Sequence, residues 1–254
     1  MNKLAVAFAL VLLAAGSGAA QEIGDRDAFI AGTSKDCPGC DLVGVRMKDR
    51  DLSGANLAGA NLTRAVFHRS NLSKANLAGA NLERANLNLA DLRFADLSGA
   101  NLKGALLYEA QAGGANFAAA NLDDTRAQTA HFQGAKLPGA TWRNSALQRI
   151  NMSSATLDGV DFTGSVLAEA DLRRSKMRGA ILDNTNSFQI RANDVDLTGA
   201  RLHHAKLERS EFNGATLTNA DFSNARLHFS RFTDTEQTGT VWTGATMPDG
   251  TVHE

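Results

Sequence analysis

The feature that most constrains this chain is a five-residue period, clearest between residues 75 and 87 as a repeated Ala-Asn-Leu-x-x. Steps of five from a centre at Leu77 run from Leu42 to Met247 with no insertion or deletion. The 42 centres are Leu, Phe, Met or Trp, except for Ala112, Ala127, Ser187, Ala192 and Gln237. Two residues before each centre stands a small residue, which is Ala in 25 repeats. An unbroken repeat of this length predicts one solenoid.

A period of five fits neither an α-helix nor a flat β-strand. On a helix, five residues turn the chain by about 500°, so successive centres would point about 140° apart and form no apolar stripe. On a strand, an odd step sends successive centres to opposite faces. The chain must therefore turn once in every repeat, and the apolar centres are buried only when neighbouring repeats stack.

Tandem Ala-Asn-Leu-x-x and Ala-Asp-Leu-x-x units resemble the pentapeptide repeat family over roughly residues 41 to 248. The resemblance implies an all-β fold, a right-handed quadrilateral β-helix of about ten coils with one repeat on each side of a square. The centre and the small residue two before it would point inward, and the other three positions outward. We expect a rod of roughly 50 Å if the coils lie about 4.8 Å apart.

Four repeats per coil place centres 20 residues apart directly above one another. One face then runs from Leu42 through Leu122 and Trp142 to Trp242, with Leu giving way to aromatic residues along it. The weakest repeats are residues 186–195, where Ser187 and Ala192 are the centres, and a local distortion or bulge is expected there. Arg50 stands at a small inward position, so either its side chain reaches outward or the regular coil begins only at Asp51.

The domain organisation follows from where the repeat begins and ends. Residues 1–20 have Lys3, an apolar run from Leu4 to Ala15, and a small-residue cleavage site near Ala20/Gln21, a pattern typical of a secretory signal peptide. The apolar run is shorter than the roughly 20 residues of a membrane span. We therefore expect a periplasmic or secreted protein with no stable membrane anchor after cleavage. Residues 21–41 would cap the 42–247 β-helix, and 248–254 would form a tail.

The cap contains the two cysteines of the chain, in Cys37-Pro38-Gly39-Cys40. A structural disulfide in an oxidising compartment is one interpretation, and many pentapeptide repeat proteins have a similar Cys-x-x-Cys-Asp-Leu start. A thiol-redox pair is the alternative, although the βαβ context of thioredoxin-like proteins is absent. Two cysteines are too few for a Cys-only zinc site.

Outward positions are where a function must lie. Two basic neighbourhoods and two exposed apolar residues are the candidate surface contacts: Arg64, Arg69, Lys74 and Arg84; Arg173, Arg174 and Arg178; and Leu89 and Phe94. These groups favour an anionic or apolar partner, whereas nearby acidic residues favour an ordinary solvated face. His131, His203, His204 and His228 are interpreted as surface histidines, and no metal or cofactor site is expected.

Charge and export bear on function. The net charge is −1; without Lys3, the one charged residue of 1–20, it becomes −2, from 25 basic and 27 acidic residues. This balance gives no electrostatic footprint for nucleic acid. The sequence favours a non-enzymatic exported scaffold for an unidentified protein or envelope partner. The alternatives are a DNA-mimicking gyrase inhibitor, as the resemblance to quinolone-resistance pentapeptide proteins implies, and a thiol-redox protein. Some pentapeptide repeat proteins dimerise through their carboxy-terminal end, and the aromatic residues in the last coils would permit a homodimer there.

Overall fold

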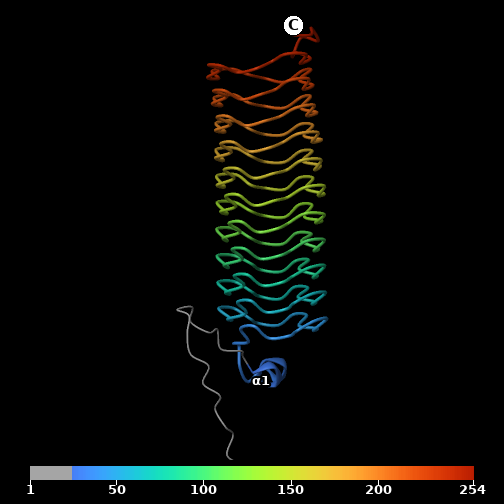
Figure 1. The fold of residues 1–254 in the computed structure, drawn as a ribbon, viewed down its shortest axis with the longest axis vertical. Helices are drawn as coiled ribbons and strands as arrows, with labels where there is room; N and C mark the ends of the chain where they lie inside the picture. The colour runs from blue at the N-terminus through green and yellow to red at the C-terminus, as the bar shows by residue number, and fades with distance from the viewer. Residues whose placement is uncertain (1–24) are drawn as a thin grey trace, which may run out of the picture.

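The computed structural model describes residues 25–254, so the expected signal peptide and the first residues of the expected cap lie outside the described part. The described chain forms one rod of stacked coils (Figure 1). Helix α1 (Arg26–Ala31) lies at the amino-terminal end of this rod, and the carboxy terminus lies at the opposite end. Within residues 25–254, no helix combines the length and apolarity needed to cross a membrane.

Each coil takes 20 residues, as the sequence predicts. Parallel bridges join residues 20 positions apart, from Asp41 with Asn61 to Arg226 with Thr246, and no register shift occurs between them. The bridging residue in every repeat is the one directly before the centre, while the two residues after the centre form a turn. One side of the square is thus one repeat, and each corner is one turn.

Backbone hydrogen bonds explain why this arrangement is stable. In the repeat centred on Leu77, the Asn76 N–H donates to Ala55 O at 2.8 Å in the coil before, and the Leu77 N–H donates to Asp96 O at 2.6 Å in the coil after. The turn is closed by the Ala80 N–H donating to Leu77 O at 3.0 Å. Because turns use two of every five residues, each side contributes a single bridging residue, and no longer strand forms in the described chain.

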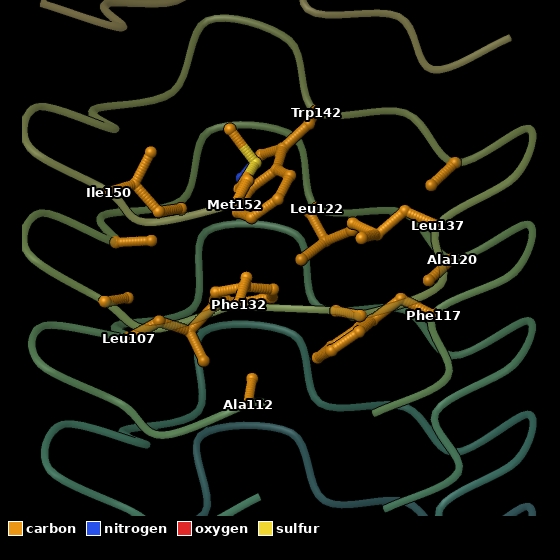
Figure 2. Close-up of a cluster of buried hydrophobic side chains, with 14 of the residues drawn as sticks. Leu107, Ala112, Phe117, Ala120, Leu122, Phe132, Leu137, Trp142, Ile150 and Met152 are labelled. Atoms are coloured by element: carbon orange, nitrogen blue, oxygen red, sulfur yellow. The ribbon is translucent and has the colours of Figure 1, made fainter. Parts of the chain in front are cut away.

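The core is a continuous column of the repeat's two inward positions. Every centre from Leu42 to Leu227 is buried. Small and large centres complement one another between coils, because Phe132 stacks one coil above Ala112 and its ring lies 5.2 Å from Phe117 and 5.0 Å from Trp142 (Figure 2). Burying one such side chain is worth about 1.5–3 kcal/mol.

Hydroxyl groups at the small inward positions are also satisfied inside the rod. The hydroxyl of Ser145 accepts from the Thr125 N–H at 3.0 Å, and that of Ser165 accepts from the Ser145 N–H at 2.9 Å. The Trp142 indole N–H donates to the Thr125 hydroxyl at 2.7 Å. These hydroxyls form a ladder in which successive members are 20 residues apart in sequence. Each of these buried hydroxyls therefore has a hydrogen-bond partner.

Residues 186–195 contain no bulge, so that part of the prediction is wrong, but the turn after Ser187 is locally altered: the Ile190 N–H donates to the Ser210 hydroxyl at 3.2 Å, where most repeats donate to the carbonyl of their centre. Asn186 pairs with Lys206 and Arg191 with Glu211 in the same 20-residue register as elsewhere. The reason is a volume exchange within the repeat, since buried Ile190 occupies the small position beside the small centre Ala192. The Ser187 hydroxyl donates to the Thr185 hydroxyl at 3.0 Å, which satisfies the other unusual centre.

The amino-terminal end is closed by α1 and the segment after it. Asp25 caps the helix by accepting from the Ala28 N–H, and Gly32 ends it in a left-handed conformation with φ 78°. Phe29 is fully buried against the core. The Arg50 guanidinium approaches Gly32, while its backbone carbonyl accepts from Asn71 at 2.9 Å. Arg50 thus belongs to a regular coil, and its side chain extends toward the cap.

The carboxy-terminal end is closed on one side only. Val252 pairs antiparallel with Thr246, and the His253 N–H donates to Ala245 O at 2.9 Å. The core residues Phe232 and Trp242 are only partly buried because no further coil covers them. The last coil therefore presents part of the core to solvent.

Candidate functional site

The corners carry the outward side chains of this molecule. The second turn residue has a positive φ in every repeat from Gly39 to Gly244, and 25 of these corner residues are not glycine. Arg64, for example, has φ 58°, and the Ala65 N–H donates to Leu62 O at 2.9 Å. A positive φ at this place is the requirement of a type II turn. Corner residues 20 apart lie on the same edge of the rod, so four edges run along its length.

The edges differ sharply in what they carry. On the edge that includes Gly79, most corner residues are glycine: Gly39, Gly59, Gly79, Gly99, Gly139, Gly159, Gly179, Gly199 and Gly239. On a second edge none of the ten is glycine: Asp49, Arg69, Leu89, Glu109, Thr129, Arg149, Glu169, Gln189, Arg209 and Phe229. A Cβ at Gly79 or Gly99 would meet nothing within 4 Å, so packing does not require the bare edge. The second edge, by contrast, holds side chains despite the cost of a left-handed backbone.

The first predicted basic neighbourhood is divided among three edges. Arg64 and Arg84 lie on one edge, 20 residues apart, whereas Arg69 and Lys74 lie on the next two. Arg84 lies 3.8 Å from Glu83. The structure therefore does not bring these four cations together on one surface.

The second predicted basic neighbourhood is largely occupied by ion pairs. Arg173 lies 2.7 Å from Asp171, and Arg178 lies 2.5 Å from Asp196. Burial alone would raise the pKa of Asp171, but hydrogen bonds from Arg173 and the nearby Arg191 charge lower it below its usual value. The pKa of Arg173 is raised by the same contact. Of this group, Arg174 alone is a corner residue, and the charge available to a partner is smaller than the sequence suggests.

The two exposed apolar candidates lie on neighbouring edges. Leu89 is half-buried, while Phe94 is 65% exposed. The Phe94 ring lies over Gly114 of the next coil, where a Cβ would come within 2.7 Å of it. Phe94 is therefore supported by the coil above rather than by another apolar side chain.

The cysteine pair joins the first two repeats of the rod. Cys37 takes a centre position, Cys40 takes the small inward position, and their sulfur atoms are 2.02 Å apart. The two residues are 0% and 1% exposed. The Cys37 N–H donates to Asn56 O at 2.8 Å in the next coil. Attack by an external thiol requires access to a sulfur, so this burial favours the structural interpretation over redox exchange.

The histidines lie at outward positions, as predicted from the spacing. His203 Nε2 lies 2.6 Å from Asp221 Oδ2, a contact between neighbouring coils that the sequence did not indicate. His228 stacks on Phe229 with ring centroids 3.7 Å apart. Among residues 25–254, no group of three or more His, Cys, Asp or Glu residues is placed to hold a metal ion.

A larger feature that reasoning from the sequence missed lies on the edge without glycine. Two adjoining cavities follow the edge without glycine in the carboxy-terminal half, and they share Arg209 and Glu211. Arg149, Arg191 and Arg231 also line them. The signal was present in the sequence, since stepping by 20 from Arg149 reaches Glu169, Gln189, Arg209 and Phe229. The prediction grouped charged residues that are close together in the sequence, and it therefore missed residues that are 20 positions apart but adjacent on one edge.

Comparison with known proteins agrees with this architecture. The family described as pentapeptide repeats matches residues 51–88, 85–124, 128–164, 145–184 and 196–234. No curated protein matches the sequence. Among solved structures, HetL is a pentapeptide repeat protein involved in heterocyst differentiation regulation from the cyanobacterium Nostoc sp. strain PCC 7120. It is 26% identical, with a TM-score of 0.50, over 92% of this chain and 100% of HetL.

Two further structures are more distant. A trypsin-treated form of QnrB1, a plasmid-mediated fluoroquinolone resistance protein, is 17% identical over 78% of this chain and 89% of its own, with a TM-score of 0.45. A pentapeptide repeat protein from the Arabidopsis thaliana thylakoid lumen is 23% identical over 62% of this chain and 68% of its own, with a TM-score of 0.14. The similarity to HetL supports a right-handed quadrilateral β-helix. From the matched repeats and the 20-residue coil, this chain belongs to the pentapeptide repeat family.

Proposed function

We propose that this protein is an exported, non-enzymatic scaffold that binds a protein or envelope partner through the edges of its rod. The observation that carries the proposal is the filled core, in which every centre from Leu42 to Leu227 is buried. A rod of about ten right-handed coils with such an interior offers its side chains to partners only from the outside. Rigid backbone pairing between coils would hold those side chains in fixed register.

Export is supported by the amino-terminal pattern and by the cysteines. Residues 1–20 have the positive start, apolar run and small-residue site of a signal peptide. The buried Cys37–Cys40 pair fits an oxidising compartment such as the periplasm or the extracellular space. A mature net charge of −2 suits neither nucleic-acid binding nor strong DNA mimicry.

A homodimer through the carboxy-terminal coils remains part of this proposal. Phe232 and Trp242 are partly exposed and stack on Phe212 and Phe222, with ring centroids 4.9 and 4.7 Å apart. The last coil also lacks the coil that would accept its backbone N–H groups. Both features favour association of two open ends, and sedimentation equilibrium of the mature chain would measure it.

The test is cell fractionation with mass spectrometry of the mature amino terminus under thiol-blocking conditions. We expect a periplasmic or secreted chain that begins near Gln21 with Cys37 and Cys40 joined. Cross-linking from an exposed edge position would then identify the partner. An uncleaved cytoplasmic chain with free thiols would overturn the proposal and make a gyrase inhibition assay the next step, and a mature chain whose thiols cycle during turnover would favour redox chemistry.

A further inference from the structure

A groove runs along the edge without glycine in the carboxy-terminal half of the rod. It consists of two adjoining cavities, of about 460 and 370 Å³, which share Arg209 and Glu211. One wall is formed by corner residues, among them Arg149 with φ 58° and Arg209 with φ 60°. The other wall is formed by bridging residues of the next side, Arg191, Glu211 and Arg231. We call this feature the arginine groove.

The arginine groove carries an excess of positive charge. Four arginines line it (149, 191, 209 and 231) against Glu169 and Glu211. Glu211 is already engaged by Asn193 at 3.1 Å and lies 4.0 Å from Arg231. Arg191 lies 3.2 Å from Asp171. Within the described chain, Arg149 and Arg209 form no ion pair, so their guanidinium groups remain available for carboxylates, which they bind in a bidentate manner.

An aromatic side chain stands at the carboxy-terminal end of the groove. Phe229 is 62% exposed, and the Arg209 guanidinium lies 5.8 Å from its ring centroid. His228 stacks on the same ring. A ring held in place by two neighbours offers an apolar contact beside a cation at little entropic cost.

The dimensions fit an extended polypeptide. Arg149 and Phe229 are four coils apart, which is about 19 Å at about 4.8 Å per coil. A strand-like peptide rises about 3.3 Å per residue, so about six residues would span the groove. Alternate side chains of such a peptide would face the same wall.

We propose that the arginine groove binds an extended acidic segment of the partner protein, with carboxylates at Arg149 and Arg209 and an apolar side chain at Phe229. This inference rests on the proposed scaffold function and names its partner class. The hollow shape favours a narrow segment over a lipid surface. A second copy of this chain is a distinct occupant that the experiment separates.

The experiment uses the full mature chain and fluorescent seven-residue peptides with Glu at alternate positions and one central Phe or Leu. A matched set replaces each Glu with Gln. The groove variant is Arg149→Glu/Arg209→Glu; Glu is compatible with the turn because Glu109 and Glu169 occupy the same edge. The control variant is Arg64→Glu/Arg84→Glu, which makes the same charge change at corner positions of another edge.

We expect saturable binding of the Glu peptides that weakens as salt rises, and much weaker binding of the Gln set. The groove variant should lose at least about tenfold in affinity, while the control variant stays within about twofold. Phe229→Ala should weaken the Phe peptide and leave the charge requirement intact. Lysine peptides should bind the groove variant better than they bind the natural protein.

Any one of five results would overturn the inference. Absence of saturable binding by any Glu peptide would do so, as would equal losses in the groove and control variants. Binding to phosphatidylglycerol vesicles that the groove variant abolishes, with no peptide binding, would assign the groove to a lipid surface, and a dimer dissociated by that variant would assign it to a second copy. If cross-linking still captures the same partner with the groove variant, the scaffold function stands and the arginine groove falls.

Discussion

The two ends of the rod cover the core and its unpaired backbone groups in different ways. The amino-terminal end is covered by α1, whose Phe29 is fully buried, and is tied by the buried Cys37–Cys40 pair. The carboxy-terminal end is covered by a short tail on one side, and Phe232 and Trp242 remain partly exposed. Both ends would otherwise expose unpaired backbone groups and core side chains. The two ends therefore differ in how completely they cover the core.

The first prediction asks whether the interior or the ends limit stability. Leu97→Asp places a charge in the fully buried column between them. We expect a loss of at least about 4 kcal/mol in the free energy of unfolding, because an unpaired buried charge adds to the lost apolar burial. Urea denaturation followed by circular dichroism measures it. Lys74→Asp introduces the same residue at an exposed corner and should change little; an unchanged cooperative transition for Leu97→Asp would contradict the inward assignment.

The second prediction compares the ends directly. Phe29→Ala should lower the local free energy of unfolding by about 3 kcal/mol, because removing a fully buried ring leaves a cavity beneath the cap. Trp242→Ala should cost less, because its ring is already partly exposed although it packs 5.7 Å from Phe232. Hydrogen exchange of the first and last coils measures each effect separately. Equal losses at the two ends would remove the distinction between them.

Much of the fold was predictable from the sequence, because the five-residue period determines both the coil and the inward positions. Leu97, Ala112 and Trp142 are buried where the period places them. The arginine groove was missed because Arg149 and Arg209 are 60 residues apart in sequence but lie on one edge. The regular register at Ile190 and Ala192 was also missed, since it depends on two side chains exchanging volume within one repeat. Such effects arise from contacts between side chains that are not visible when each repeat is considered alone.

The third prediction concerns the cysteines of the closed end. Cys37→Ala/Cys40→Ala should destabilise the protein by about 2 kcal/mol, the amount expected for closing a loop of only a few residues. Reduction of the natural protein by dithiothreitol should be slow, because both sulfur atoms are buried. Phe29→Ala should accelerate it by opening the cap, whereas Trp242→Ala should not. Rapid reduction of the natural protein would show that the cap is open.

The fourth prediction concerns the open end. Removing residues 249–254 deletes the backbone contacts of Gly244 with His253 at 2.8 Å and of Met247 with Thr251 at 2.7 Å. We expect the free energy of unfolding to fall by about 1 kcal/mol. The loss of a few hydrogen bonds is partly offset by the conformational entropy that the tail no longer has to give up on folding. Faster hydrogen exchange should appear at Gly244 and Met247, whose N–H groups donate to the tail, and not at Leu42. Loss of protection at Leu42 as well would mean that the tail stabilises the whole rod.

The smallest expected effect is a decrease in the stability of both ends at low pH. Hydrogen bonds from Ser53 and Lys35 lower the pKa of Asp51 to about 2, and the Lys35 contact, at 3.0 Å, ties the cap to the next coil. A hydrogen bond from the Thr251 hydroxyl likewise lowers the pKa of Asp249 in the tail. Both folded pKa values lie below the unfolded value of about 3.9.

The stabilisation from these groups is therefore complete above about pH 4 and, for Asp51, is lost as the pH falls toward 2. We expect hydrogen exchange, corrected for its intrinsic pH dependence, to show the cap loosening over that interval, and Asp51→Asn to remove most of the pH dependence there. Asp249→Asn should do the same for the tail without affecting the cap. If Asp51→Asn instead altered the acid response of both ends equally, the two caps would belong to one cooperative unit, and the contrast between a closed and an open end would not hold.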